Sequence, residues 1–357
     1  MEIPEISNLT RFAFAPTYLP DQDGRPLLVL VVKGSFAIGK GQTLSLAERQ
    51  IEVMPAGLAW DARPNGSFKY EPDIAFAKCA TDVVLVGSAS APRPGTTAMD
   101  VELRAGALRK TVRIFGDRRW MKSLTGFRAS APAPFERIEL RFERAFGGGE
   151  PVGEEALHRH FDVRNPIGVG YTAPGRPVVD GLAMPNLEDP SALISTANDR
   201  PAPAGFGFTS PHWQPRAAFA GTYDHAWRTS RMPLLPADFD LRFFSAASAG
   251  LTAPGFFKGD EPIQVLGASP GGALSFDLPG VRPPVCRVKR RSCPDEIVET
   301  RLDTVVVDTD ESLVLLTWRG HLRLKRGPED VLAIDIAEPA GIGDRLATAA
   351  SSVSAVR

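Results

Sequence analysis

The fold class of this chain is decided by one stretch, Leu27-Leu28-Val29-Leu30-Val31-Val32-Lys33-Gly34-Ser35-Phe36-Ala37-Ile38. Its β-branched and apolar residues, which follow the turn-like Asp21-Gln22-Asp23-Gly24, predict a long buried strand. The longest apolar run of the chain, Leu27 to Val32, lies in the same stretch and is far shorter than the roughly 20 residues of a membrane-spanning helix. We therefore expect a β protein with no integral membrane association.

Further strand signals lie on both sides of this stretch. Val101-Glu102-Leu103-Arg104 and Thr111-Val112-Arg113-Ile114-Phe115 alternate between apolar and polar residues around a short glycine-containing turn, which predicts a hairpin. Val305-Val306-Val307 and Leu313-Val314-Leu315-Leu316-Thr317-Trp318 flank an acidic turn and predict a second hairpin. Other predicted strands cover residues 83–87, 138–143, 263–266, 274–278 and 285–288, while residues 331–337 fit either a strand or a short helix.

Composition agrees with this fold class. The 357 residues include 33 glycines and 32 prolines, about 18% of the chain against roughly 12% in ordinary proteins. We predict a mainly β fold, in which antiparallel strands form a sandwich or barrel-like core with long ordered Pro/Gly-rich loops and few short helices. Residues 1–340 would form a single large β-rich domain, or two packed β subdomains (about 1–145 and 237–340) with a loop-rich layer at 146–236, and residues 341–357 a flexible C-terminal tail.

The middle of the chain, residues 144–236, has little periodicity and recurrent Pro and Gly. A stretch of this length without regular structure is usually functional when it is ordered. Residues 154–160 and 191–197 are weak helix candidates within it.

Trp, Tyr and Arg concentrate between residues 213 and 231, and these residue types dominate the energetics of protein interfaces. The predicted partner-binding residues are Trp213, Arg216, Tyr223, Asp224, Trp227, Arg228 and Arg231. The alternative is structural: Arg216 and Arg228 would pair with Asp224, Asp238 or Asp240, and the indoles would pack beneath the loops.

The charges and cysteines narrow the range of functions. The net charge is −1, from 41 basic and 42 acidic residues, so no overall field would attract nucleic acid or an anionic membrane. Three cysteines without paired short spacing favour reduced thiols over disulfides or a zinc site. The first residues carry acidic rather than basic side chains and no apolar segment follows, so we expect a cytoplasmic location.

No motif predicts a catalytic residue, a cofactor or a metal. The five histidines have no spacing typical of metal ligands. Gly147-Gly148-Gly149 lacks a following Gly-Lys-Ser/Thr, so a tight turn or close backbone approach is expected there rather than a phosphate loop.

Short stretches from about residue 8 to about residue 320 together resemble a bacterial family of unknown function that has been linked to type VI secretion. The stretches include Asp23-Gly24-Arg25-Pro26-Leu27, Lys78-Cys79-Ala80-Thr81-Asp82, Gly116-Asp117-Arg118-Arg119-Trp120, Glu143-Arg144-Ala145-Phe146-Gly147-Gly148, Asn165-Pro166-Ile167-Gly168, Trp213-Gln214-Pro215-Arg216, Ala220-Gly221-Thr222-Tyr223-Asp224 and Pro233-Leu234-Leu235-Pro236. After Pro279 the resemblance becomes weaker.

The resemblance implies a non-enzymatic adaptor or chaperone that loads a toxic effector onto the spike. Its partners would be the secreted effector, the spike components (VgrG and the PAAR-type tip protein), or the effector and the spike components together. Two alternatives stay open on the residues alone. One is a hydrolase or carbohydrate-active enzyme that uses paired carboxylates, such as Asp238 with Asp240 or Glu143 with Glu150. The other is a structural part of the exported spike.

Overall fold

The computed structural model describes residues 4–61, 66–124, 126–151, 159–291 and 293–339. Most regular structure in these residues is β-strand, and one short α-helix is present, α1 (His225–Ser230). The sheets are predominantly antiparallel and none of those described closes into a barrel. The predicted mainly β class is therefore confirmed, in a sandwich-like rather than a barrel-like form.

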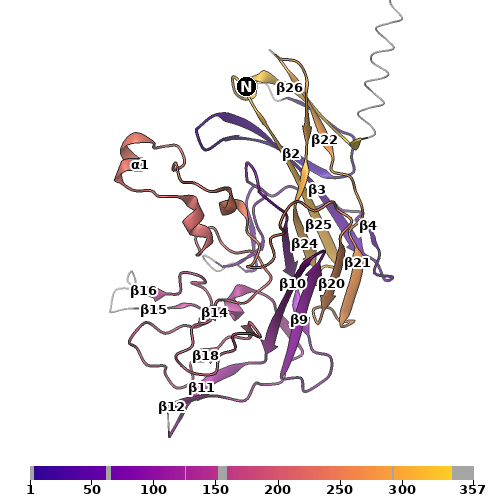
Figure 1. The fold of residues 1–357 in the computed structure, drawn as a ribbon. Coiled ribbons are helices and arrows are strands. Elements are labelled where there is room, and N and C mark those ends of the chain that lie inside the picture. Colours follow the sequence, from indigo (N-terminus) through magenta and orange to yellow (C-terminus); the bar gives the residue numbers. More distant parts are fainter. Residues whose placement is uncertain (1–3, 62–65, 125, 152–158, 292, 340–357) are drawn as a thin grey trace, which may run out of the picture.

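A six-stranded sheet is the centre of the molecule (Figure 1). Its strands, in spatial order, are β2 (Ala13–Pro20), β3 (Pro26–Ile38), β25 (Leu313–Arg323), β24 (Arg301–Asp308) and β7 (Asp82–Val86), with β4 (Leu44–Leu46) paired to the end of β3. All neighbours are antiparallel except β24 and β7. Strands from both ends of the chain therefore lie side by side in one sheet.

Two further sheets pack against this one. The five-stranded sheet has the order β19 (Leu187–Glu188), β10 (Leu108–Phe115), β9 (Ala98–Ala105), β20 (Pro262–Leu266) and β21 (Ala273–Asp277). The four-stranded sheet has the order β1 (Glu5–Asn8), β26 (Val331–Ala337), β22 (Val285–Arg290) and β23 (Glu296–Glu299). The two predicted hairpins are confirmed as β9–β10 and β24–β25, and residues 331–337 form a strand.

The main hydrophobic core lies between the layers. Successive side chains of a strand point to opposite faces, so Leu28, Leu30 and Val32 of β3 enter this core. They meet side chains of the other two sheets there, including Leu103 and Ile334. The opposite face of β3 is buried as well, which explains why its sequence is a nearly continuous apolar run rather than an alternating one.

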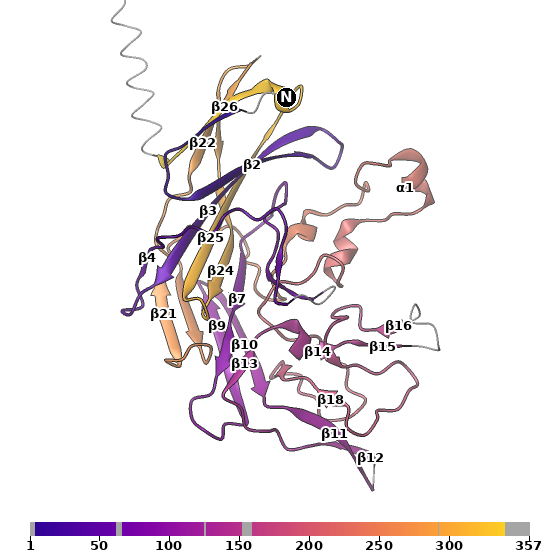
Figure 2. The same ribbon diagram turned by 180° about the vertical axis from the view of Figure 1, so that it is seen from behind.

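Smaller elements build the remaining side of the molecule (Figures 1 and 2). The short strands are β5 (Leu58–Ala59), β6 (Phe68–Tyr70), β8 (Ser88–Ser90), β11 (Arg118–Ser123), β12 (Gly126–Ala129), β13 (Arg137–Glu139), β14 (Phe146–Gly147), β15 (Gly149–Pro151), β16 (Arg159–Phe161), β17 (Val169–Gly170) and β18 (Ala183–Met184). Single turns of 3-10 helix occur at Phe142–Arg144, Arg216–Ala220, Leu241–Phe244 and Pro328–Asp330.

Three predictions for residues 138–197 are not confirmed by the structure. The strand predicted for residues 138–143 is too long, because β13 ends at Glu139 and a 3-10 turn begins at Phe142. The helix predicted for residues 191–197 is wrong, because the Asp199 carboxylate accepts the backbone N–H groups of Ser195 and Thr196 in a turn that competes with a helix. The helix predicted for residues 154–160 falls mostly outside the described residues, as do residues 341–357.

The triple glycine forms the close backbone approach that its sequence predicts. A Cβ on Gly147 would lie 2.2 Å from the carbonyl oxygen of Asn165, and φ is +146° at this position. Asn165 is fully buried, and its Nδ2 donates to the carbonyls of Phe142 and Phe146 at 2.8 and 3.0 Å. The glycine therefore lets two loop segments meet, with no need of a phosphate.

Candidate functional site

The seven predicted partner-binding residues fall into two groups, and the first group, Trp213 and Arg216, is buried. Trp213 is 4% exposed, and its ring meets that of Phe142 edge-on at a centroid distance of 5.3 Å. Arg216 donates to the carbonyl oxygens of Thr209 and Phe243 at 2.6 and 2.7 Å and forms an ion pair with Glu71. Their burial gives both side chains a structural role, so direct partner contact stays a prediction only for the others.

The structural alternative predicted that Arg216 forms an ion pair with a carboxylate, and this is confirmed. The predicted carboxylates, Asp224, Asp238 and Asp240, are wrong. The expected carboxylates have other uses: Asp224 caps α1, Asp238 accepts from Thr222, and Asp240 accepts from Arg242. The carboxylate that pairs with Arg216 is Glu71, far earlier in the chain. Within the described residues, the exposed Arg228 side chain has no hydrogen-bond or ion-pair partner.

The second group lies on residues 221–240, which we call the arm. The arm stands out from the sheets in both Figure 1 and Figure 2 and contains α1. The Asp224 carboxylate accepts the backbone N–H of Trp227 at 2.8 Å and so caps the first turn of α1. The Trp227 indole donates to the carbonyl of Leu234 at 2.8 Å and meets the Tyr223 ring at 4.7 Å. These contacts hold the arm in one shape.

The base of the arm is tied to the turn between β2 and β3. Arg231 donates to the Gln22 carbonyl at 3.1 Å and to the Asp23 carboxylate at 2.9 Å. In return, the Gln22 side chain donates to the carbonyls of Pro236 and Ala237 at 2.9 and 3.1 Å. The bond from Arg231 lowers the pKa of Asp23. Arg231 is therefore an anchoring residue, and it connects the arm to the strand pair that defines the fold.

The outer surface of the arm is partly apolar. Tyr223 is 49% exposed and Met232 is 60% exposed. His225 and Arg228 are exposed beside them. An exposed aromatic ring, a flexible thioether and an unpaired guanidinium are features of protein-binding surfaces.

Two cavities lie beside the buried pair Trp213 and Arg216. One, of about 320 Å³, is mainly apolar and is bounded by Arg216, Phe142 and Phe219 among others. The other, of about 580 Å³, is bounded by Trp213, Phe161 and further residues of the loops. The loop side of the molecule is thus hollowed around two side chains that are fixed from within.

A layer of charged residues lies under the other face of the central sheet, between two apolar clusters. The basic and acidic members are equal in number: Lys33, Lys78, Arg216 and Arg319 with Glu71, Asp73, Asp82 and Asp303. The separations are 2.7 Å for Lys33–Asp73, 2.8 Å for Lys78–Asp82 and 2.6 Å for Arg319–Asp303. Because each charge is matched by a neighbour, the layer fixes the covering segment, residues 70–82, on the sheet.

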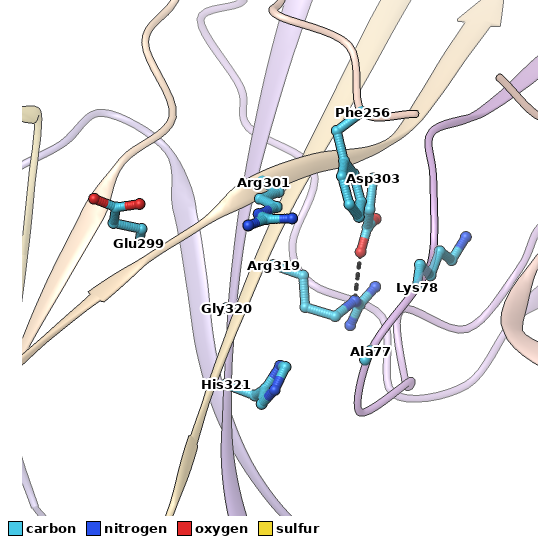
Figure 3. A pocket seen from close by; sticks show the side chains of 9 residues that line it. All are labelled: Ala77, Lys78, Phe256, Glu299, Arg301, Asp303, Arg319, Gly320 and His321. Atoms are coloured by element: carbon cyan, nitrogen blue, oxygen red, sulfur yellow. Dashed lines mark hydrogen bonds and ion pairs between the residues drawn. The ribbon is translucent and has the colours of Figure 1, made fainter. Parts of the chain in front are cut away.

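A cavity of about 310 Å³ opens at one end of this layer (Figure 3). Its side chains come from the covering segment, from the last residue of β23 (Glu299), from β24 and from β25, together with Phe256. Lys78, Asp303 and Arg319 lie at its inner end, and Arg301 and His321 lie on the two neighbouring strands. The sequence did not predict this cavity. It gave one signal for the charged layer beside it, Lys33, which is a charge inside an otherwise apolar strand.

The carboxylates that would serve a hydrolase lie apart from this cavity. Asp238 is held ionised by Thr222 and Asp240 by Arg242, and both pKa values are lowered by these bonds. A general acid in a glycosidase requires a raised pKa, which is the opposite direction. Glu143 accepts two hydrogen bonds from Ser67, and the side chain of Glu150 lies outside the described part.

In the described part of the chain, no metal-binding cluster, no disulfide and no membrane-spanning helix is present. It contains no group of three or more His, Cys, Asp or Glu residues arranged to hold a metal ion. Its three cysteines, Cys79, Cys286 and Cys293, are all free thiols. None of its helices has the length and apolar character needed to cross a membrane.

The fold and the site together define a mainly β protein with a hollowed loop side and an anchored, projecting arm. The chain belongs to the family of uncharacterized proteins conserved in bacteria, DUF2169, whose model matches residues 23–319. This match includes the charged layer, the whole arm and the central sheet except β2 and the end of β25. No curated protein and no solved structure matches the chain.

Proposed function

We propose that this protein is a non-enzymatic adaptor, or chaperone, of a type VI secretion system. In the cytoplasm it would bind a toxic effector and help to load it onto the VgrG spike and its PAAR tip. The observation that carries the binding role is the arm, which is tied to the central sheet and exposes Tyr223, Arg228 and Met232. The choice of secretion system rests on the family resemblance of the sequence.

The arm suits a binding surface because its shape is set before a partner arrives. The cap at Asp224, the indole bond to Leu234 and the anchor through Arg231 restrict the freedom that binding would otherwise have to remove. A specific interface buries on the order of 1,000 Å² or more, so the partner would extend from the arm onto the hollowed loop side.

The proposal is tested by recovering partners from the native bacterium with a tagged copy of this chain. The test variant is Tyr223→Ser/Arg228→Glu/Met232→Ser, which changes exposed side chains. It removes the ring contact between Tyr223 and Trp227 but leaves the Asp224 cap, the Trp227–Leu234 bond and the Arg231 anchor intact. The control is Leu124→Ser, at a fully exposed position on the distant β11–β12 turn. We expect the effector or spike protein to be recovered with the wild type and the control but lost with the triple variant.

If the triple variant recovered the same partner at wild-type yield, the arm would not be part of the binding interface. Recovery of no effector or spike component with the wild type would remove the secretion role. For the enzymatic alternative, the measurement is an activity screen with and without divalent metal. A turnover abolished by Asp238→Asn or Asp240→Asn, with the fold intact, would contradict the adaptor proposal.

A further inference from the structure

The cavity shown in Figure 3 contains two arginines directly opposite each other on neighbouring antiparallel strands. Arg301 of β24 pairs in register with Arg319 of β25. Residues in this relation have Cβ atoms about 5 Å apart, and like charges there are unfavourable without compensation. A pair of guanidinium groups at the mouth of a cavity therefore needs a source of negative charge.

Only one of the two arginines has its own carboxylate. Arg319 donates through Nε to Asp303 at 2.6 Å and through Nη1 to the carbonyls of Asp73 and Ala75 at 2.7 and 3.2 Å. Its Nη2 has no hydrogen bond within the described residues. Arg301 has no ion pair in that part of the chain, and its guanidinium lies 5.2 Å from the ring centroid of Phe256.

A β-bulge produces this arrangement. The register of β24 against β25 shifts between Leu302 and Thr304, so Asp303 is an extra residue in the strand. The Asp303 carboxylate consequently reaches Arg319 while the Thr304 hydroxyl accepts from Lys78 on the same face of the sheet. Bulges are frequent beside functional sites because they redirect side chains in this way.

Arg301 is a positive charge that the other charged groups around the cavity do not balance. Lys78 is paired with Asp82 at 2.8 Å. Glu299 also borders the cavity, but it forms no ion pair with Arg301, and in Figure 3 it points away from the arginines. His321 lies two residues from Arg319 on the same face of β25, and burial together with Arg323 and Arg301 lowers its pKa. A neutral imidazole therefore adds a hydrogen-bond donor without adding charge.

We propose that this cavity is a binding site for a single carboxylate group, held by Arg301, the free Nη2 of Arg319 and the imidazole of His321. A planar carboxylate matches the fork of a guanidinium. A phosphate carries more charge than one unpaired arginine would balance, and its additional charge would be repelled by the nearby Asp303. The site is on the sheet rather than on the arm, so the inference is independent of the adaptor role.

The experiment is a titration of the intact protein, at constant ionic strength in chloride, followed by the NMR signals of His321. These signals are assigned with His321→Gln. The probes are propionate, inorganic phosphate, and the capped peptides acetyl-Gly-Glu-Gly-amide and acetyl-Gly-Gln-Gly-amide. We expect a saturable shift with propionate or with the glutamate peptide, accompanied by a rise in the pKa of His321, because an adjacent anion favours the imidazolium.

Arg301→Gln should weaken binding by about tenfold or more, the loss expected for one charge-assisted hydrogen bond. The matched control is Arg128→Gln, an exposed arginine on the β11–β12 hairpin that should bind as the wild type does. Binding of the peptide alone assigns the carboxylate to a protein partner, and binding of propionate as well assigns it to a small acid. No saturable shift, an unchanged affinity in Arg301→Gln, or tighter binding of phosphate would overturn the proposal.

Discussion

Replacing Arg216 by alanine tests whether this residue stabilises the fold or contacts a partner. The side chains of Arg216 and Glu71 are only 8% and 11% exposed, so the substitution leaves a buried carboxylate without its partner. It also removes the donors that Thr209 and Phe243 accept from at 2.6 and 2.7 Å. We expect a large loss of folding free energy without any partner present.

The magnitude follows from the ion pair and the adjoining cavity. Removing one partner of a buried pair costs about 3–5 kcal/mol, and each carbonyl left unpaired adds about 1–3 kcal/mol if it stays dry. The cavity of about 320 Å³ that Arg216 borders can admit water to these carbonyls. We therefore expect a total loss of about 3–5 kcal/mol rather than the full sum.

The assay is urea unfolding, followed by tryptophan fluorescence and by far-ultraviolet circular dichroism to check that the transitions coincide. Arg228→Ala is the control, and at an exposed site without partners it should change stability by about 0.5 kcal/mol or less. The double variant Glu71→Leu/Arg216→Met should recover most of the loss, since it removes both charges. A stability of Arg216→Ala within about 1 kcal/mol of the wild type would refute the structural assignment.

Three further predictions concern the core, the glycine loop and a half-buried lysine. Trp213→Ala should lower the free energy of unfolding by about 3–5 kcal/mol in the same assay, as for other buried aromatic residues; an unchanged midpoint would contradict its place in the core. Gly147→Ala should sharply lower the melting temperature, because the new Cβ would lie 2.2 Å from the Asn165 carbonyl oxygen, and a wild-type melting curve would disprove that contact. Burial lowers the pKa of Lys110 to about 8, so its amine should gain reactivity with acetic anhydride near that pH. Lys78 is the internal control for this labelling, because nearby carboxylates raise its pKa although burial opposes them. If mass spectrometry showed the same dependence of acetylation on pH for Lys110 and Lys78, the lowered pKa of Lys110 would be excluded.

The mainly β class could be predicted from the sequence because strand patterns are local. Residues 27–38 became β3, and each predicted hairpin formed where an alternating pair flanked a short turn. The close approach at Gly147 followed equally from residue type. The short helix α1 was missed because its main signal, the cap at Asp224, is a single residue before only six helical ones.

Side-chain pairing in the candidate sites could not be predicted in the same way. Arg319 donates to the carbonyl of Asp73, 246 positions away in the sequence, because the strand order brings β25 next to β3 beneath the covering segment. The opposition of Arg301 and Arg319 likewise depends on register and on one bulge. A charge in a sequence has many possible partners, and only the packing of distant strands selects one.

The sequence by itself determined that this chain forms strands, turns and a long aromatic-rich middle segment, since those properties depend on neighbouring residues. The tertiary structure decided that Trp213 and Arg216 lie inside while Tyr223 and Arg228 lie outside, although all four occur within one short stretch. The physical reason is that burial depends on which distant segments cover a residue. Here Glu71 covers Arg216, and the turn after β2 holds the base of the arm.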